Sequence, residues 1–170
     1  ASSWKQVSDL VWEFEIAPGL AFSNGEPINA ETVAWSAAYL VDPANAKPQA
    51  NRLTASITAV EAVGDLTVRV TTSYPDQTVP SRMGALAVIP PKAVEEAGAA
   101  FFTAPVGSGP FLVEQFLPEE RLVLVRNPDV VGLEPALLDR VVIEVTPQAG
   151  SRVAALQSGD VDAIRAVPTE

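Results

Sequence analysis

The chain contains neither cysteine nor histidine among its 170 residues. Their absence excludes thiolate nucleophiles, zinc sites built from Cys and His, haem ligation by His, and Ser–His–Asp catalytic triads. Basic residues are also scarce, with 11 Lys and Arg against 21 Asp and Glu and a net charge of −10. Binding to a nucleic-acid backbone requires clustered Lys and Arg. We therefore expect no nucleic-acid partner, and nothing in the sequence indicates a cofactor or a metal.

Long apolar runs are missing as well. The longest, "GALAVI" at 84–89, ends at two prolines and is much shorter than a membrane-spanning helix. The first ten residues lack the charged-then-apolar pattern of a signal peptide, so we expect no targeting segment within this chain. Hydrophobic residues make up 48% and charged residues 19% of the sequence, which is typical of a globular chain with a sizeable core.

Patterns before residue 105 predict an antiparallel region with helices. Apolar residues alternate with polar ones around "DLVWEFEI", and "ITAVEAV" and "LTVRVTT" flank a Gly-Asp pair suited to a hairpin. An asparagine precedes one helical pattern, and prolines begin another. The expected elements are a strand over 9–16, a helix over 30–41 capped by Asn29, a loop over 43–51, a hairpin around Gly64-Asp65, and a short helix ending at Gly98.

The pattern of predicted strands and helices changes after residue 110. "FLVEQFL" and "RLVLVRN" predict a second hairpin around "PEE". A strand over 140–145, a helix over 148–159 and a strand over 160–167 follow, and this order predicts a βαβ unit with parallel strands. The predicted fold class is therefore mixed α+β and α/β, with an antiparallel region followed by a βαβ unit.

The heptad "PVGSGPF" at 105–111 lies between these two regions. A phosphate-binding loop would be followed by a helix, whereas here Pro110 removes a backbone N–H and a strand follows. A nucleophile elbow requires G-x-S-x-G and a histidine, and the chain has neither. The heptad is therefore interpreted as a hinge or domain junction. The positions expected nearest to a cleft or hinge are Gly107, Ser108, Gly109 and Pro110.

Acidic and aromatic residues offer few catalytic candidates. Asp160 and Asp162 lie on one side of an extended segment but provide too few oxygen ligands for calcium, and Glu119 falls in a predicted turn. No spacing pairs a general acid with a base, so the chain is predicted not to be an enzyme, with carboxylate-based hydrolysis as the rival hypothesis. The larger aromatics could line a ligand groove, but their spacing favours the core: Trp4, Trp12, Trp35, Tyr39 and Tyr74.

Several stretches, in order, resemble one known family. "VWEFEIAPGLAFSNGEPINAETV" resembles the block W-x-F-x-hydrophobic-R-x-G-hydrophobic-x-F-x-[DN]-G-x-P of extracytoplasmic solute-binding proteins of family 5, the oligopeptide, dipeptide and nickel-binding group. "PVGSGPF" is similar to that family's P-hydrophobic-G-[ST]-G-P-[YF], and "RNPD" to its R-N-P-x-Y-W. "LDRVVIEV" and "SRVAALQSGDVDAI" resemble its later segments.

The resemblance implies a periplasmic-binding-protein-like fold of type II and a component that delivers peptides or similar small solutes to an ABC transporter permease. It implies a periplasmic or extracytoplasmic location. The full-length parent protein could then be a membrane-anchored lipoprotein. Family members have two lobes and an inserted domain, so the chain resembles a fragment. Residues 1–104 would be the inserted antiparallel α+β domain, and residues 105–170 part of the first lobe with the βαβ unit.

The chain departs from the family pattern at four positions. Ala17 and Ala21 stand where the family has Arg and Lys, and Val130-Val131 stand where it has Tyr-Trp. These departures, and the missing second lobe, leave a second hypothesis open. The chain would then be a structural or interaction module that binds no ligand and forms a homodimer through exposed strand edges.

Overall fold

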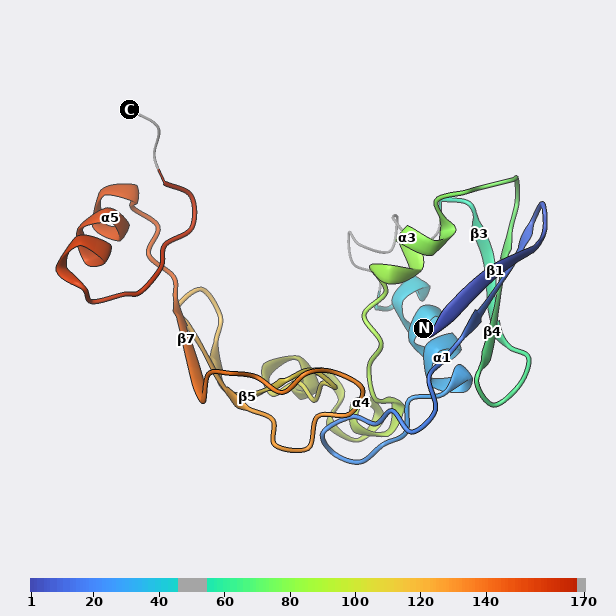
Figure 1. Cartoon of the computed structure of the whole chain (residues 1–170), viewed down its shortest axis with the longest axis horizontal. Coiled ribbons are helices and arrows are strands. Elements are labelled where there is room, and N and C mark those ends of the chain that lie inside the picture. The colour runs from blue at the N-terminus through green and yellow to red at the C-terminus, as the bar shows by residue number, and fades with distance from the viewer. Residues whose placement is uncertain (46–54, 168–170) are drawn as a thin grey trace.

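The computed structural model describes residues 1–45 and 55–167. They form an elongated molecule with a four-stranded sheet at one end, a three-stranded sheet in the middle, and helix α5 at the other end (Figure 1). The loop predicted over 43–51 lies partly outside the described residues.

The four-stranded sheet is antiparallel throughout, in the order β1-β2-β4-β3. Helix α1 packs against β3 and β4, so the sheet has one face covered by this helix. The predicted strand around "DLVWEFEI" and the hairpin around Gly64-Asp65 are confirmed as β2 and as β3 with β4. The elements are β1 (Ser3–Ser8), β2 (Val11–Glu15), α1 (Ala30–Val41), β3 (Ile57–Ala62) and β4 (Thr67–Thr72).

Alternation in β2 and β4 builds the core of this sheet. Trp12 pairs with Val70 and Phe14 with Val68 across the two strands, and all four side chains are buried. Cross-strand partners share a face, so the apolar residues of both strands meet beneath α1. Burial of a side chain of this size stabilises the fold by about 1.5–3 kcal/mol.

Helix α1 begins where the sequence predicted. The Asn29 side chain accepts a hydrogen bond from the backbone N–H of Thr32 at 2.9 Å. This bond satisfies one of the N–H groups that have no partner within the first turn. Thr32 also donates its hydroxyl to the carbonyl of Pro27 at 3.0 Å, which fixes the entry of the chain into the helix.

Three short helical segments connect the two sheets. Of these, the sequence predicted α4, which begins at Pro91 and ends before Gly98 as expected, but it did not predict α3. The Glu26 carboxylate accepts hydrogen bonds from the backbone N–H groups of Lys92 and Ala93 at 3.0 and 3.1 Å. It thereby caps α4 from a turn far away in the sequence. The segments are α3 (Val79–Gly84), α4 (Pro91–Ala97) and η1 (Gly98–Thr103).

The second sheet is antiparallel in the order β5-β6-β7. The predicted hairpin around "PEE", the strand near 140–145 and the following helix are confirmed. The elements are β5 (Phe111–Leu117), β6 (Arg121–Arg126), β7 (Arg140–Glu144) and α5 (Ala149–Ser158).

The predicted strand over 160–167, and with it the βαβ unit, is wrong for this chain. The segment pairs with no strand, and α5 buries none of its residues. A parallel strand gains hydrogen bonds only beside another strand, and its crossover helix is stable only when it packs on the sheet. Here Arg152 donates to the carbonyl of Ala166 at 3.1 Å, which holds the segment against α5 instead.

The expectation that the aromatics belong to the core holds for Trp12 alone. Trp4 and Tyr74 are 57% and 51% exposed. Trp35 and Tyr39 are half-buried and stack on each other, with 5.1 Å between ring centroids. The spacing of aromatics along the chain indicated which face of an element they occupy, but not whether another element covers that face.

Candidate binding site at the junction of the two sheets

The heptad 105–111 runs from the end of η1 to the first residue of β5, and hydrogen bonds tie it to two other motifs. The Ser23 backbone N–H donates to the carbonyl of Gly107 at 2.9 Å. From the other side, the Asn127 backbone N–H donates to the carbonyl of Pro110 at 2.9 Å, and its side-chain Nδ2 donates to the carbonyl of Gly109 at 3.0 Å. The blocks "FSNGEP", "PVGSGPF" and "RNPD" therefore meet at one place.

Asn127 is buried, and all of its side-chain polar atoms lie in this network. Its Oδ1 accepts from the backbone N–H of Asp129 at 3.1 Å, which closes a turn after β6. A buried amide is tolerated only when its donors and acceptor find partners. The network therefore fixes the heptad relative to the loop that follows β6.

The two glycines of the heptad have ordinary backbone conformations. Neither Gly107 nor Gly109 has a positive φ. A Cβ added to either would meet nothing within 4 Å among the described atoms. A left-handed backbone conformation therefore does not explain why glycine stands at these two positions. Their backbones border open space, which leaves room for another molecule or segment to approach closely.

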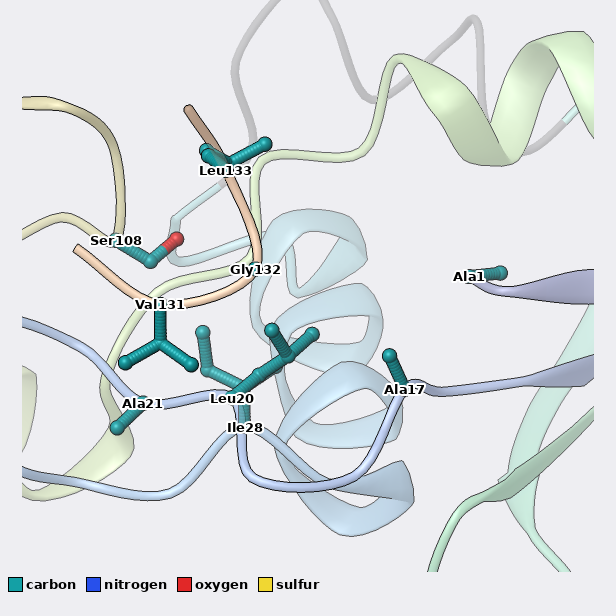
Figure 2. Close-up of a pocket in the computed structure, with 9 residues that line it drawn as sticks. All are labelled: Ala1, Ala17, Leu20, Ala21, Ile28, Ser108, Val131, Gly132 and Leu133. Carbon is teal, nitrogen blue, oxygen red and sulfur yellow. The ribbon is translucent and has the colours of Figure 1, made fainter. Parts of the chain in front are cut away.

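Beside the heptad lies a cavity of about 300 Å³, which we call the junction pocket (Figure 2). Its walls come from the end of β2 and the following turn, from the heptad, and from the loop after β6. The lining side chains are aliphatic apart from Ser108, and none of them is charged. The residues are Ala1, Ala17, Leu20, Ala21, Ile28, Ser108, Val131, Gly132 and Leu133. Of the predicted positions, the structure places Ser108 in the wall.

Gly132 determines how closely the loop after β6 approaches the opposite wall. It has a φ of 75°, and a Cβ built on it would lie 2.7 Å from Cδ2 of Leu20. Glycine adopts this left-handed conformation without steric cost, and no larger residue fits the contact without displacement. Sequence reasoning missed Leu20, Ile28 and Gly132. The sequence signals that pointed to this place were the heptad with Ser108 and the departures at Ala17, Ala21 and Val131.

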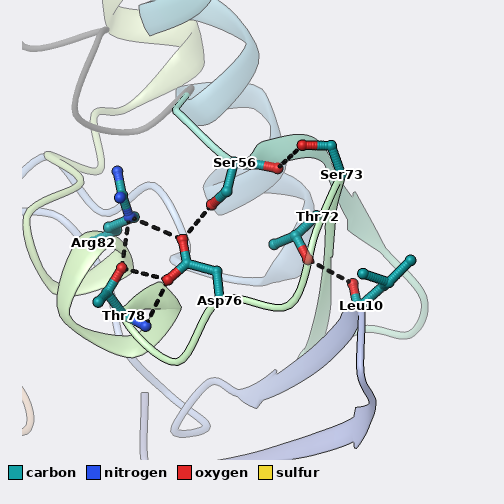
Figure 3. Close-up of polar contacts among 7 residues, drawn as sticks. All are labelled: Leu10, Ser56, Thr72, Ser73, Asp76, Thr78 and Arg82. Carbon is teal, nitrogen blue, oxygen red and sulfur yellow. Dashed lines mark hydrogen bonds and ion pairs between the residues drawn. The ribbon is translucent and has the colours of Figure 1, made fainter.

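The strongest buried polar cluster lies elsewhere, around Asp76 (Figure 3). The Ser56 hydroxyl donates to Oδ2 of Asp76, while the Thr78 backbone N–H and hydroxyl donate to Oδ1 at 2.8 and 2.6 Å. Arg82 forms an ion pair with the same carboxylate at 3.3 Å. The cluster joins the segment before β3 to the start of α3, so it has a structural role.

Hydrogen bonds in this cluster lower the pKa of Asp76 from 3.8 to about 2, with those from Ser56 and Thr78 as the main cause. On β2, hydrogen bonds from Arg69 and Lys5 lower the pKa of Glu13. A general acid that works near neutral pH requires a raised carboxyl pKa, so both shifts run in the opposite direction.

The other acidic candidates are not brought together. Asp160 is exposed beyond α5, where its Oδ2 accepts from the Ser158 hydroxyl at 2.7 Å. Asp162 is also exposed, and Glu119 lies in the β5–β6 turn. The structure therefore offers an uncharged apolar pocket at the junction, which suits binding rather than proton transfer.

Comparison with known proteins decides the family. A model of the bacterial extracellular solute-binding proteins, family 5 (middle region), matches residues 1–170. The chain belongs to this family. The resemblance stated from its motifs is thereby confirmed.

Family-5 relatives match the chain along nearly all of its length. A probable D,D-dipeptide-binding periplasmic protein, DdpA of Escherichia coli K12, is 30% identical over the whole chain, which covers 34% of that protein. Among solved structures, Haemophilus influenzae OppA in complex with RPPGFSPFR has a TM-score of 0.85 and 25% identity, covering 95% of this chain and 36% of OppA. MoaA of A. tumefaciens R10, in complex with mannopinic acid, has a TM-score of 0.83 and 30% identity, with 95% and 33% covered.

These family-5 neighbours confirm the periplasmic-binding-protein-like fold class. The chain spans about a third of the length of the relatives that it matches. The relatives named here are binding proteins. Within the part of the chain that the structure describes, no helix is long and apolar enough to cross a membrane.

Proposed function

We propose that this chain is part of the substrate-binding component of an ABC importer, that it contributes to binding peptides or similar small solutes outside the cytoplasmic membrane, and that it is not an enzyme. The observation that carries the proposal is the junction pocket, which lies where three family motifs meet. Small-molecule sites are commonly concave, mostly apolar, and placed between domains. Relatives with this fold bind RPPGFSPFR and mannopinic acid, which supports a solute of this size range and a permease as partner.

In this proposal residues 1–104 are the inserted domain and residues 105–170 are part of the first lobe. The change from one antiparallel sheet to another across the heptad supports this boundary. Gly107, Ser108, Gly109 and Pro110 are the residues that approach the solute or act as the hinge. The open space beside both glycines supports this role, because absent side chains allow a ligand to contact the backbone.

The test is a thermal-shift and calorimetric screen of the 170-residue chain with D,D-dialanine, RPPGFSPFR and a mixed tripeptide pool. A ligand that binds the folded state raises the melting temperature by mass action. Gly109→Ala and Gly107→Ala should weaken peptide binding at least tenfold while leaving the melting temperature of the free chain within a few degrees, because a Cβ at either position meets nothing within 4 Å.

Gly150→Ala on α5 is the matched control, since a Cβ there also meets nothing within 4 Å. Equal peptide affinity in the Gly109 and Gly150 variants would remove the heptad from the site. If none of the three probes binds, the result would argue against solute binding by this chain.

A second candidate function is self-association through the β5-β6-β7 sheet. Its register places seven apolar side chains on one face, and the helices among the described residues make at most marginal contact with these strands. Phe116 and Ile143 on this face are 37% and 48% exposed, and such surfaces mark protein interfaces. The face consists of Phe111, Val113, Phe116, Leu122, Leu124, Val141 and Ile143.

Light scattering coupled to size-exclusion chromatography tests this second candidate. A concentration-dependent dimer that Phe116→Lys converts to monomer would support self-association through this face. A monomer at all concentrations would exclude it.

A further inference from the structure

The junction pocket has a chemistry that restricts what can enter it. Its volume of about 300 Å³ and its aliphatic walls favour an apolar group. No acidic or basic side chain lines it, so a charged group would lose its hydration without gaining an ion pair to a side chain. A solute would therefore present an uncharged part of its structure here.

Three of the four departures from the family pattern line this one pocket. Ala17, Ala21 and Val131 all contribute to its walls, and each replaces a much larger residue of the pattern quoted above. They lie far apart in the sequence, on the turn after β2 and the loop after β6, and the structure brings them together (Figure 2). Small residues at all three positions leave space from both sides of the pocket.

Specific backbone contacts and hydrogen bonds fix the wall of the junction pocket that the loop after β6 forms. Gly132 holds the loop after β6 in contact range of Leu20, and Asn127 fixes the start of the same loop. The Ser108 hydroxyl is the one side-chain polar group in the wall. It has no hydrogen-bond partner among the described residues, so it can accept one bond from a ligand N–H.

We propose that the junction pocket is a specificity pocket that binds a flat, uncharged apolar group of the solute, of the size of an indole ring. The inference rests on the proposed solute-binding function and adds the class of side chain that is selected. The pattern's residue at position 131 is itself an indole-bearing tryptophan, which Val131 replaces. A solute with a tryptophan-like group would fill the volume thus released and direct its ring N–H to Ser108.

Free indole is the probe, followed by two-dimensional ¹H–¹⁵N NMR of the 170-residue chain. Indole should shift the amide signals of Ala21, Ser108 and Gly132 in a saturable manner. Val131→Trp, which refills the pocket from one wall, and Ala21→Leu, which refills it from the other, should each weaken indole binding at least tenfold. Ser108→Ala should weaken it severalfold without lowering the melting temperature.

A matched control exists in a second apolar pocket of about 310 Å³ between α1 and β3, lined in part by Val41 and Val60. Val41→Trp there should leave indole binding unchanged. Indole that binds equally well to Val131→Trp and to Ala21→Leu would overturn the proposal, as would absence of saturable shifts in the unmodified chain.

Two tripeptides that differ only in carrying tryptophan or lysine, added to the peptide screen, distinguish this inference from the proposed function. Peptides that bind with equal affinity whether they carry tryptophan or lysine would leave solute binding standing and overturn the specificity pocket. Saturable indole binding at Gly132 with no peptide bound would support the pocket and contradict the transport role.

Discussion

The backbone N–H of Ser23 and the carbonyl of Gly107 are 84 positions apart in sequence and form a 2.9 Å hydrogen bond. The bond joins the asparagine–glycine turn of the first unit to the crossing between the two sheets. On the opposite side, Asn127 holds the same crossing through Gly109 and Pro110. The junction is thus held by both of the units that it connects, and its geometry depends on each.

Loss of the Asn127 side chain should destabilise the junction. Asn127→Ala leaves the carbonyl of Gly109 and the N–H of Asp129 without their partner, at a cost of about 1–3 kcal/mol in the free energy of unfolding. Urea denaturation followed by circular dichroism measures it. Gln157→Ala on the exposed surface of α5 is the control. An equal effect in the two variants would show that the Asn127 hydrogen bonds do not stabilise the junction.

Acid should weaken the fold through Asp76. Its pKa is 3.8 when unfolded and about 2 when folded, so the folded state holds the carboxylate in its charged form more strongly. The resulting stabilisation is fully present above the unfolded value and is lost as the pH falls from 3.8 through about 2.

Asp76→Asn should therefore lower stability near neutral pH and flatten its decline in acid. Equilibrium unfolding at a series of pH values tests this, with Ser56→Ala as an intermediate case because it removes one of the donors. Parallel acid profiles for the parent chain and Asp76→Asn would show that another group controls the transition.

Gly132→Ala should destabilise the chain in two separable ways. The new methyl group would lie 2.7 Å from Leu20 Cδ2, and the φ of 75° is strained for alanine. We expect a loss of about 1–3 kcal/mol from crowding and backbone strain together. In the double variant with Leu20→Ala the crowding part should disappear while the strain remains. Additive losses in this double-mutant cycle would rule out the contact.

Glu119→Gly should stabilise the β5–β6 hairpin. Glu119 has a φ of 63° in the turn, and a residue with a Cβ pays roughly 1 kcal/mol for this conformation. Thermal unfolding should show a net gain of up to about 0.5 kcal/mol, because the chain entropy that glycine adds to the unfolded state offsets part of the relieved strain. Glu120→Gly is the control, because its φ is not positive and glycine there only adds chain entropy to the unfolded state.

Local signals predicted much of the first unit. The alternation around Trp12 and Phe14 and the cap at Asn29 depend on near neighbours, and both are confirmed. The heptad was recognised as a crossing, but the structural partner of its backbone, Asn127, lies beyond the β5–β6 hairpin and no local pattern indicates the pairing.

The failures share one physical cause. The strand over 160–167 was expected from its alternating residues, but alternation shows only which side chains could be buried together. Whether a neighbouring strand is present is a property of the assembled sheet. The exposure of Trp4 has the same origin. Its partner across the strands, Phe14, is buried, whereas β1 is the edge strand farthest from β3 and β4, on which α1 packs.

Glu26 has a consequence for the order in which the chain assembles. Helix α4 is seven residues long, too short to persist in water by itself. Its first turn is completed by a carboxylate from 66 positions earlier, so α4 should acquire slow amide hydrogen exchange only after the turn carrying Glu26 has formed. A substitution that disrupts the turn carrying Glu26 would therefore first cause fraying of the distant helix α4, while the strands of the sheets stay intact.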